Sequence, residues 1–431
     1  MRNTVIALAT VAGLVAAAGC SSGGSGSGTT SNGKVVVTFA NWAAAETNTA
    51  PGIAAMIKEF ESLHHNITIK SEPISYTDIE HQLVLEQQSG NAPDVAEVQG
   101  NYLYTADATG GLQPLTSFAT SSFQQSIIPR ELSLSKIGGQ LVAIPWTVGP
   151  LALWYNKKIM SEAGLSPQAP SSWTALLADA KVIHQKFPKV IVFGDDSTSR
   201  EYGLDENWPI MKSFGAVPFS GSTATSASPA MQNYLSFMRT LAKDDYTPEG
   251  QKAGYFRQPA ASNQVAFTND GPYVKGVVQS VNHETDAQFY ANWGVAPLPA
   301  GPSGAHYSAP TDHQLVMFKS ATGATATAAW QFMTFLATSS YAVTKYTIPY
   351  EGSIPPLAHP SGAVAALLNN PVSQAFLKDV IPDVITPAWG TQYSSSYLDV
   401  MAGIQKAMTS SEPIGQVASS MQSAVSTDVR G

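Results

Sequence analysis

Four of the eight tryptophans stand in segments predicted to be loops, beside polar or small residues: Trp42, Trp146, Trp208 and Trp389. An indole ring presents a flat apolar surface, and neighbouring carboxyl and amide groups can form hydrogen bonds. An indole ring and such polar groups together could bind a small molecule that has both apolar and polar faces. A structural role is the alternative for each ring. The other four follow helical or strand-like apolar patterns and are predicted to lie in a core: Trp154, Trp173, Trp293 and Trp330.

Two groups of candidate binding residues follow the ends of predicted strands. Trp42 and Glu46 come after an apolar strand at residues 35–39. The second group comes after a predicted strand at residues 93–98: Gln99, Asn101 and Tyr102. In open α/β sheets, ligands bind outside the carboxyl ends of the strands. We therefore expect both groups to face one binding cleft.

The later candidates lie near predicted turns and chain crossings. Because Trp208 is flanked by Asp205, Glu206 and Asn207, we predict a loop that reaches the cleft rather than a position in a dry core. Tyr273 follows a Gly-Pro turn that should project its ring away from the preceding strand. Asp205 and the residues at the crossings complete the candidate set: Thr147 beside Trp146, Asp312 and His313, and Glu351, Gly352 and Ser353.

No catalytic signature in the chain is convincing. Ser133 and Lys136 form a Ser-x-x-Lys match, but the Ser-Asp-Asn and Lys-Thr-Gly motifs that accompany it in penicillin-binding enzymes are missing. The sequence has no Gly-x-Ser-x-Gly elbow, no His-Glu-x-x-His helix and no P-loop. We predict no catalytic residue, no metal site and no cofactor. A hydrolase stays the rival class, because 31 acidic residues make a facing pair of carboxylates easy to form.

Bulk composition narrows the class of protein further. The 431 residues are too many for one core, so two lobes are expected. The net charge of -8 argues against binding to nucleic acid, which needs clustered Lys and Arg. Because Cys20 is the single cysteine, intrachain disulfides and cysteine-based zinc sites are excluded.

The amino-terminal segment has the pattern of an export signal. Arg2 precedes an apolar run from Val5 to Ala18, which is shorter than the ~20 residues that a membrane-spanning helix needs. Gly19 and Cys20 then look like the end of a bacterial lipobox, in which Cys20 would carry a lipid. The alternative is an ordinary secretory signal that is cut near Ala18. Residues 1–20 are thus a predicted lipoprotein signal, and the Ser/Gly-rich residues 21–33 are a predicted tether.

The remaining sequence alternates predicted strands and helices. Strands are expected at residues 35–39, 66–70 and 93–98, with one helix opening at Pro51 between them and another starting in a capping box at residues 77–80. This order predicts parallel sheets covered by helices. Pro and Gly cluster near residues 138–139, 296–304 and 348–356. We predict that at each of these three places the chain crosses from one lobe to the other, and we call them the first, second and third crossings. Three crossings predict two α/β lobes around a central cleft.

Several stretches, in this order, resemble the bacterial extracellular solute-binding family that includes maltose-binding protein. They are "NAPDVAEVQGNYLYTADATGGLQPL", "QLVAIPWTVGPLALWYNKKIMSEAGL", "APSSWTALLADAKVI", "QVAFTNDGPYVKGVV", "WGVAPLPAGPSG" and "AAWQFMTFLATS". The resemblance implies a periplasmic-binding-protein-like fold. It places one lobe at residues 34–143 plus 309–350 and the other at residues 144–308 plus 351–431. It also gives Tyr273 the position of a ring that stacks on ligand.

The resemblance further implies a function. The chain would be a monomeric, non-enzymatic lipoprotein on the outer face of the cytoplasmic membrane. It would capture a carbohydrate, an oligosaccharide or a disaccharide, and deliver it to the permease of an ATP-driven importer. Aromatic rings would contact the apolar C–H faces of the sugar, and polar groups would bind its hydroxyls. Glycerophosphodiesters and polyols are the alternative ligands within the same family.

Overall fold

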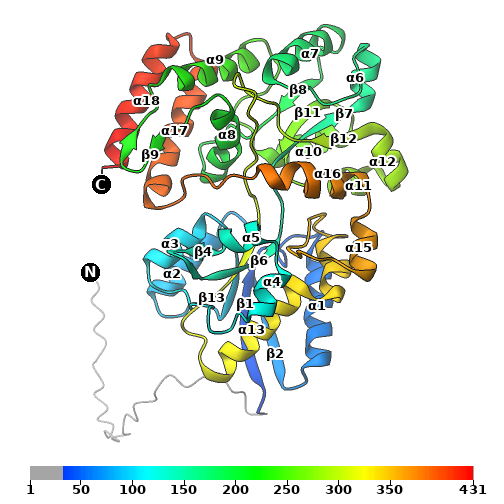
Figure 1. The fold of residues 1–431 in the computed structure, drawn as a ribbon, viewed down its shortest axis with the longest axis vertical. Helices are drawn as coiled ribbons and strands as arrows, with labels where there is room; N and C mark the ends of the chain where they lie inside the picture. The colour runs from blue at the N-terminus through cyan, green and yellow to red at the C-terminus, as the bar shows by residue number, and fades with distance from the viewer. Residues whose placement is uncertain (1–32, 431) are drawn as a thin grey trace, which may run out of the picture.

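The computed structural model describes residues 33–430, and the predicted signal, Cys20 and the tether up to residue 32 lie outside them. The lower lobe in Figure 1 is built on a five-stranded sheet. In spatial order its strands are β2 (Ile67–Pro73), β1 (Val35–Asn41), β3 (Val95–Gln99), β13 (His313–Met317) and β6 (Ala143–Thr147). β1 runs parallel to β2 and β3, whereas β13 runs antiparallel to β3 and β6.

Helices α1 (Ala50–Leu63) and α2 (Ile79–Gln88) connect the three parallel strands, as predicted from the alternating pattern. The predicted capping box before α2 is wrong, because the side chain of the N-cap residue Asp78 makes no capping hydrogen bond. The other helical segments of this part of the chain are α3 (Tyr102–Ala108), α4 (Ser121–Ser126), α5 (Pro129–Leu134), α13 (Gly323–Thr338), α14 (Ser340–Ala342) and a π-helical turn, η1 (Val343–Thr347).

The upper lobe contains a four-stranded sheet (Figure 1). Its strands, in spatial order, are β12 (Trp293–Ala296), β7 (Ala152–Asn156), β11 (Val265–Asp270) and β8 (Ile191–Gly194). β11 is parallel to β8 and antiparallel to β7. The expected architecture of two α/β lobes is therefore confirmed. Neither sheet is purely parallel, because β7, β12 and β13 run against their neighbours.

Helices surround the upper sheet, and several shorter segments follow β13. The helices are α6 (Lys157–Ala163), α7 (Trp173–Lys186), α8 (Glu201–Ser213), α9 (Pro229–Lys243), α10 (Ala253–Ala261), α11 (Tyr273–Asn282), α12 (Asp286–Asn292), α17 (Thr391–Thr409) and α18 (Ile414–Asp428). The shorter segments are α15 (Gly362–Leu368), α16 (Pro371–Ala375), η2 (Phe376–Val380) and η3 (Ile381–Asp383). Two small hairpins complete the fold, β4 (Lys136–Ile137) with β5 (Gln140–Leu141) and β9 (Phe219–Ser220) with β10 (Thr223–Ala224).

The first crossing between the lobes lies later in the chain than predicted. Gly138 and Gly139, with φ angles of 57° and 81°, form the turn of the β4–β5 hairpin instead. β6 still belongs to the lower sheet, so the chain leaves that sheet after Thr147 and enters the upper sheet at Ala152. The predicted boundary between residues 143 and 144 thus falls inside β6, after its first residue.

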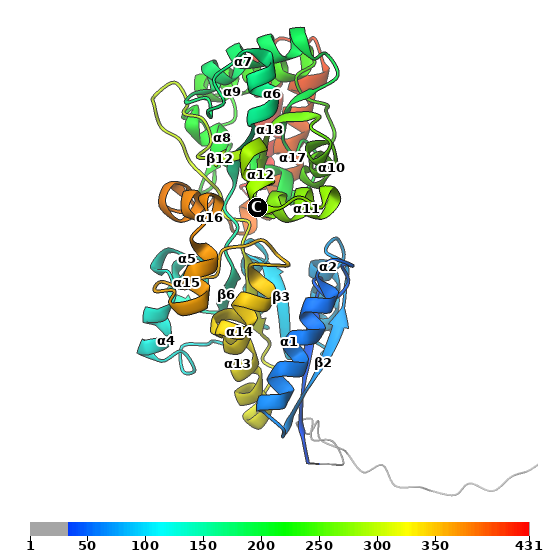
Figure 2. The same ribbon diagram turned by 90° about the vertical axis from the view of Figure 1, so that its right-hand side faces the viewer.

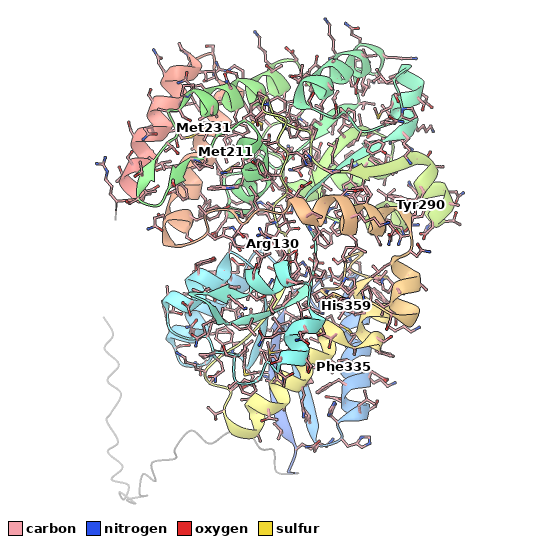
Figure 3. All side chains as sticks on the ribbon, in the orientation of Figure 1. Arg130, Met211, Met231, Tyr290, Phe335 and His359 are labelled. Carbon is pink, nitrogen blue, oxygen red and sulfur yellow. The ribbon has the colours of Figure 1, made fainter. Side chains whose placement is uncertain are left out.

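Each lobe has its own hydrophobic core, and a third cluster joins the two. Met231 belongs to the core of the upper lobe, and Phe335 packs against the core of the lower lobe (Figure 3). The third cluster combines Trp154 of β7 with Val148 of the first crossing and Ile354 of the third. The prediction of a core position is confirmed for Trp154, Trp173 and Trp293, whereas Trp330 is half-buried against the lower core.

A buried pair of carboxyl groups lies where two crossings meet. The Asp312 Oδ1 atom accepts a hydrogen bond of 2.8 Å from the Gly149 N–H, so it ties the second crossing to the first. Burial, followed by the nearby Asp312 carboxyl, raises the pKa of Glu131 in α5 well above its usual value. Two adjacent buried negative charges would be costly. The arrangement therefore requires a proton on this pair.

Replacing Glu131 by Gln should make folding stability less sensitive to pH. A raised carboxyl pKa stabilises the folded state fully below the unfolded pKa, and this stabilisation is lost as the pH rises toward the folded pKa. Relative to E131Q, the wild type should lose up to about 1.4 kcal/mol per pH unit. Urea unfolding at acidic and mildly alkaline pH measures this difference. The exposed Glu162→Gln serves as the control, and a difference from E131Q that does not change with pH would contradict the expectation.

Candidate functional site

The lower sheet brings several predicted binding residues to one edge. β1 and β3 are parallel, so Trp42 and Gln99 lie at the same end of the sheet. His313 begins the antiparallel strand β13 and pairs with Gln99 on one side and with Thr147 on the other. Residues from three distant parts of the sequence thus meet at this edge, as the rule for the carboxyl ends of strands predicts.

Four rings form a continuous row that starts at this edge and reaches the upper lobe. Tyr76 lies 5.5 Å from Trp42, and Trp42 lies 4.8 Å from His313, in both cases edge to face between ring centroids. His313 is nearly parallel to Tyr273, with centroids 5.9 Å apart and planes inclined by 14°. We call Tyr76, Trp42, His313 and Tyr273 the aromatic row. Its first three members come from the lower lobe and its fourth from α11 of the upper lobe.

Tyr273 is held by contacts on several sides. Its hydroxyl donates a hydrogen bond of 2.9 Å to the Thr311 carbonyl oxygen in the second crossing. The Arg257 guanidinium lies 5.5 Å from the ring centroid and also binds both carboxylate oxygens of Asp270, at 2.8 and 2.9 Å. A Cβ atom at residue 149 would lie only 2.2 Å from the Tyr273 hydroxyl, so Gly149 permits this close approach.

The environment of His313 in the aromatic row disfavours charge on His313 and on the neighbouring Glu97. The His313 Nδ1 atom lies 2.9 Å from Glu97 Oε1, and both side chains are almost fully buried. Burial lowers the pKa of His313 and raises the pKa of Glu97 well above its usual value. Both groups are therefore driven toward their uncharged forms, which can still donate and accept hydrogen bonds.

A second contact between the lobes involves Trp389. Its indole N–H donates a 2.8 Å hydrogen bond to Asp205 of α8, and its ring lies edge-on to Tyr104 of α3, with centroids 6.5 Å apart. A Cβ atom at residue 100, just after β3, would lie 2.9 Å from the Trp389 ring. Gly100 therefore lets the upper lobe approach the end of the lower sheet.

Carboxyl groups near this contact have raised pKa values. Burial and the Glu201 carboxylate raise the pKa of Glu80 to about 8. Burial raises the pKa of Asp205 to about 7, although hydrogen bonds from Tyr393 and Trp389 oppose the shift. Since Glu80 belongs to α2 and Glu201 to α8, two acidic groups face each other from different lobes.

The structure brings many of the predicted site residues together. Around the aromatic row it places Trp42, Glu46, Gln99, Asp312, His313, Tyr273, Glu351, Gly352 and Ser353. Around Trp389 it places Asn101 and Asp205. Among all the described residues, no three or more His, Cys, Asp or Glu side chains are arranged to hold a metal ion.

Several predicted site residues take structural positions instead. The loop predicted at Trp208 is wrong, because the residue lies in α8, is 4% exposed and packs against Phe219 and Tyr393 in the upper core. Trp146 is a strand residue of β6 that stacks on Tyr346, and Thr147 and Tyr102 are also buried. For these residues, and for Trp42, which is 3% exposed, contact with ligand stays a prediction that their burial does not favour.

Other residues of the site were missed by sequence reasoning. Tyr76 follows β2 in the same way that Trp42 follows β1, so the strand-end rule could have found it. Arg257 gave no such signal, whereas Arg200 stands near Trp208 in the sequence, which kept phosphate among the alternative ligands. Arg257 reaches the row from α10, where its guanidinium lies over the Tyr273 ring and pairs with Asp270. Arg200 precedes α8 and acts electrostatically on Tyr76 across the lobes.

Comparisons with known proteins agree with the two-lobe fold. The sequence model of the bacterial extracellular solute-binding protein family matches residues 43–343. A binding protein of Brucella abortus is 22% identical over 308 residues, which cover 70% of this chain and 72% of the relative. A solute-binding protein of an ABC transporter from Thermotoga lettingae, solved with α-D-tagatose, shares the fold with a TM-score of 0.78, 20% identity and coverage of 91% and 99%. The cyclic α-maltosyl-1,6-maltose binding protein of Arthrobacter globiformis gives a TM-score of 0.76, 19% identity and coverage of 92% and 100%.

Replacing Gly100 by Leu should separate the lobes at Trp389. The new side chain would collide with the indole ring, and overpacking of this kind costs about 1–3 kcal/mol, roughly a 5- to 150-fold shift between closed and separated lobes. Small-angle scattering should show a larger radius of gyration. The matched control is Gly254→Leu in α10, where a Cβ atom would meet open space. Equal radii for the two variants would contradict the role of Gly100.

Proposed function

The chain belongs to the bacterial extracellular solute-binding protein family, and we propose that it captures a carbohydrate between its lobes and delivers it to the permease of an ABC importer. An oligosaccharide or a disaccharide is the ligand we propose. Two proteins of similar fold have been solved as a complex with α-D-tagatose and as a cyclic maltosyl-maltose binding protein, which supports a sugar as the ligand here.

The aromatic row is the observation that carries the proposal. Sugars present apolar C–H faces that pack on aromatic rings, and hydroxyl groups that need hydrogen-bond partners at the ring edges. The row supplies rings from both lobes, and polar groups such as Gln99 and Glu46 lie beside it. A ligand that contacts the row would touch both lobes at once. This supports capture by closure of the lobes around the ligand.

The charges around the row favour a neutral sugar over a glycerophosphodiester. Arg257 is paired with Asp270, and Arg200 is paired with Asp196, so neither guanidinium is available as an uncompensated phosphate ligand. Burial raises the pKa of Glu351 and of Glu46. Groups of this kind can donate or accept hydrogen bonds to hydroxyls without a strong demand for a charged partner.

A ligand screen tests the proposal. Melting temperatures of the protein should rise with maltose, maltotriose or another oligosaccharide, because a ligand at 100 times its Kd stabilises the fold by about 2.7 kcal/mol. Glycerophosphodiesters and polyols form the comparison arm. We also propose that the protein acts as a monomer and does not turn its ligand over. Hydrolysis of a bound glycoside would overturn the binding role in favour of an exported hydrolase.

Tyr273→Ala should weaken binding of the sugar found in the screen. Loss of the ring removes apolar contact worth on the order of 2 kcal/mol at ~25 cal/mol per Å², or roughly 30-fold in affinity. Tyr273→Phe keeps the ring and loses only the hydrogen bond to Thr311, so its affinity should stay much closer to the wild type. Calorimetry measures both variants. Equal affinities for all three proteins would exclude Tyr273 as a sugar platform.

We further propose that Cys20 carries a lipid that holds the protein at the outer face of the cytoplasmic membrane. Its position between an apolar run and a Ser/Gly-rich spacer supports this role. Within residues 33–430, no helix is both long and apolar enough to cross a bilayer. Expressed in a bacterium, the wild type should partition into the detergent phase and Cys20→Ser into the aqueous phase. Aqueous partitioning of both would refute the anchor.

A further inference from the structure

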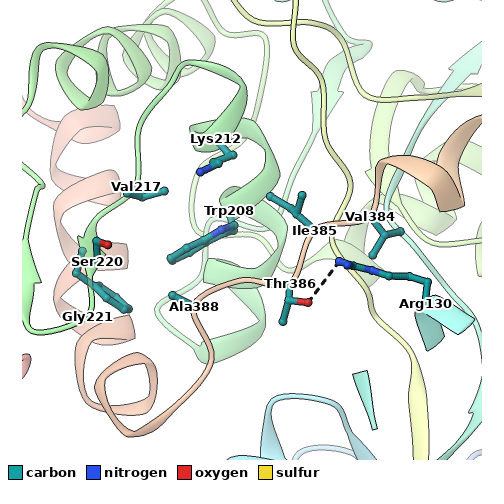
Figure 4. Close-up of a pocket in the computed structure, with 11 residues that line it drawn as sticks. Arg130, Trp208, Lys212, Val217, Ser220, Gly221, Val384, Ile385, Thr386 and Ala388 are labelled. Carbon is teal, nitrogen blue, oxygen red and sulfur yellow. Dashed lines mark hydrogen bonds between the residues drawn. The ribbon is translucent and has the colours of Figure 1, made fainter. Parts of the chain in front are cut away.

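A cavity of about 470 Å³ lies away from the aromatic row, at the boundary between the lobes (Figure 4). Its walls come from α8, the β9–β10 hairpin, the segment at residues 384–388 and Arg130 of α5. Figure 2 shows α5 on the opposite side of the molecule from α2, α10 and α11, near which the row is built. The volume falls within the ~300–1,000 Å³ that small-molecule sites occupy.

The lining of this cavity offers donors and positive charge. Arg130 and Lys212 contribute cations, and no Asp or Glu belongs to the described residues that line it. The Trp208 ring projects into the space (Figure 4), and the residue is 4% exposed. In a chain with a net charge of -8, such a lining is unexpected and points to an acceptor-rich anion.

Among the residues that line the cavity, Arg130 carries a charge that no described acidic side chain pairs with. It lies between the two lobes (Figure 3), and within residues 33–430 its guanidinium makes a single hydrogen bond, a long one of 3.4 Å to the Thr386 hydroxyl (Figure 4). The Arg130 Nε atom is buried and has no partner among the described residues. Glu131 and Asp312 are the acidic groups on which it acts electrostatically, but burial raises the pKa of both, and neither forms an ion pair with it. Arg200 and Arg257, in contrast, are each paired with an aspartate.

We propose that this cavity is a second ligand site, for a small anion with a flat apolar body, such as an aryl carboxylate or an aryl phosphate. The anionic group would bind Arg130, since guanidinium donors suit carboxylate and phosphate oxygens. The apolar body would pass Ile385 and rest against Trp208. Lys212, which follows Trp208 by one turn of α8, adds positive potential. Because Arg130 comes from α5 and the other walls from the upper lobe, the bound anion would contact both lobes.

The Trp208 indole N–H provides a local signal for the test. The full-length chain is labelled with ¹⁵N at tryptophan, the Trp208 resonance is assigned with Trp208→Phe, and phenyl phosphate is titrated. The resonance should shift and saturate. Phenol has the aromatic ring without the anionic group, and inorganic phosphate has the anionic group without the ring. Both should bind more weakly than phenyl phosphate. Arg130→Gln should weaken phenyl phosphate about tenfold or more, because hydrogen bonds to a charged group are lost.

Two further variants make the outcome decisive. Lys212→Gln should also weaken binding of phenyl phosphate. It replaces Arg130→Gln as the test variant if Arg130→Gln lowers the melting temperature. Lys243→Gln, an exposed lysine at the far end of α9, should leave the titration unchanged. An unsaturable shift, or equal affinities for the wild type, Arg130→Gln and Lys212→Gln, would overturn the second site.

Discussion

The packing of Tyr273 against His313 is the contact on which the rest of the site depends. It joins a helix start of the upper lobe to the first residue of a strand in the lower sheet. The contact is possible because Gly149 leaves room for the hydroxyl, which then bonds to the Thr311 carbonyl oxygen. Two crossings and both lobes therefore converge on one ring. If the lobes separate, the contacts of Tyr273 with the lower lobe and the crossings must break, or the residues that make them must move together.

Burial of charge follows a consistent pattern in this protein. Charged residues make up only 13% of the chain, and the arginines nearest the aromatic row are each matched by one buried aspartate. The surplus carboxyl groups at the lobe boundary, such as Glu97, Asp205 and Glu80, have raised pKa values instead. A boundary with few uncompensated charges can close without a large desolvation penalty. Arg130 and Lys212 depart from this pattern, which makes their cavity distinct.

Much of the architecture could be predicted because local pattern and global fold agree. The apolar run at residues 35–39 forms β1, and the helical spacing after Pro51 forms α1. The first crossing was misplaced because Gly138 and Gly139 can form either a hinge or a hairpin turn. A pair of glycines shows that the backbone bends, whereas only strand pairing shows which sheet the following residues join.

The sequence alone determined the class of fold, the ends of the parallel strands and the residues that follow them. The tertiary structure decided which tryptophans are accessible. Trp208 stands next to Asp205, Glu206 and Asn207, a pattern typical of a solvated loop. In the folded chain α8 is buried on most sides, and these polar groups find partners within the protein: Glu206 accepts from the Asp196 N–H, and Asn207 bonds to the Asp196 and Gly203 carbonyls. Neighbours in sequence cannot reveal such partners, because hydrogen bonds from distant segments determine whether a polar residue can be buried.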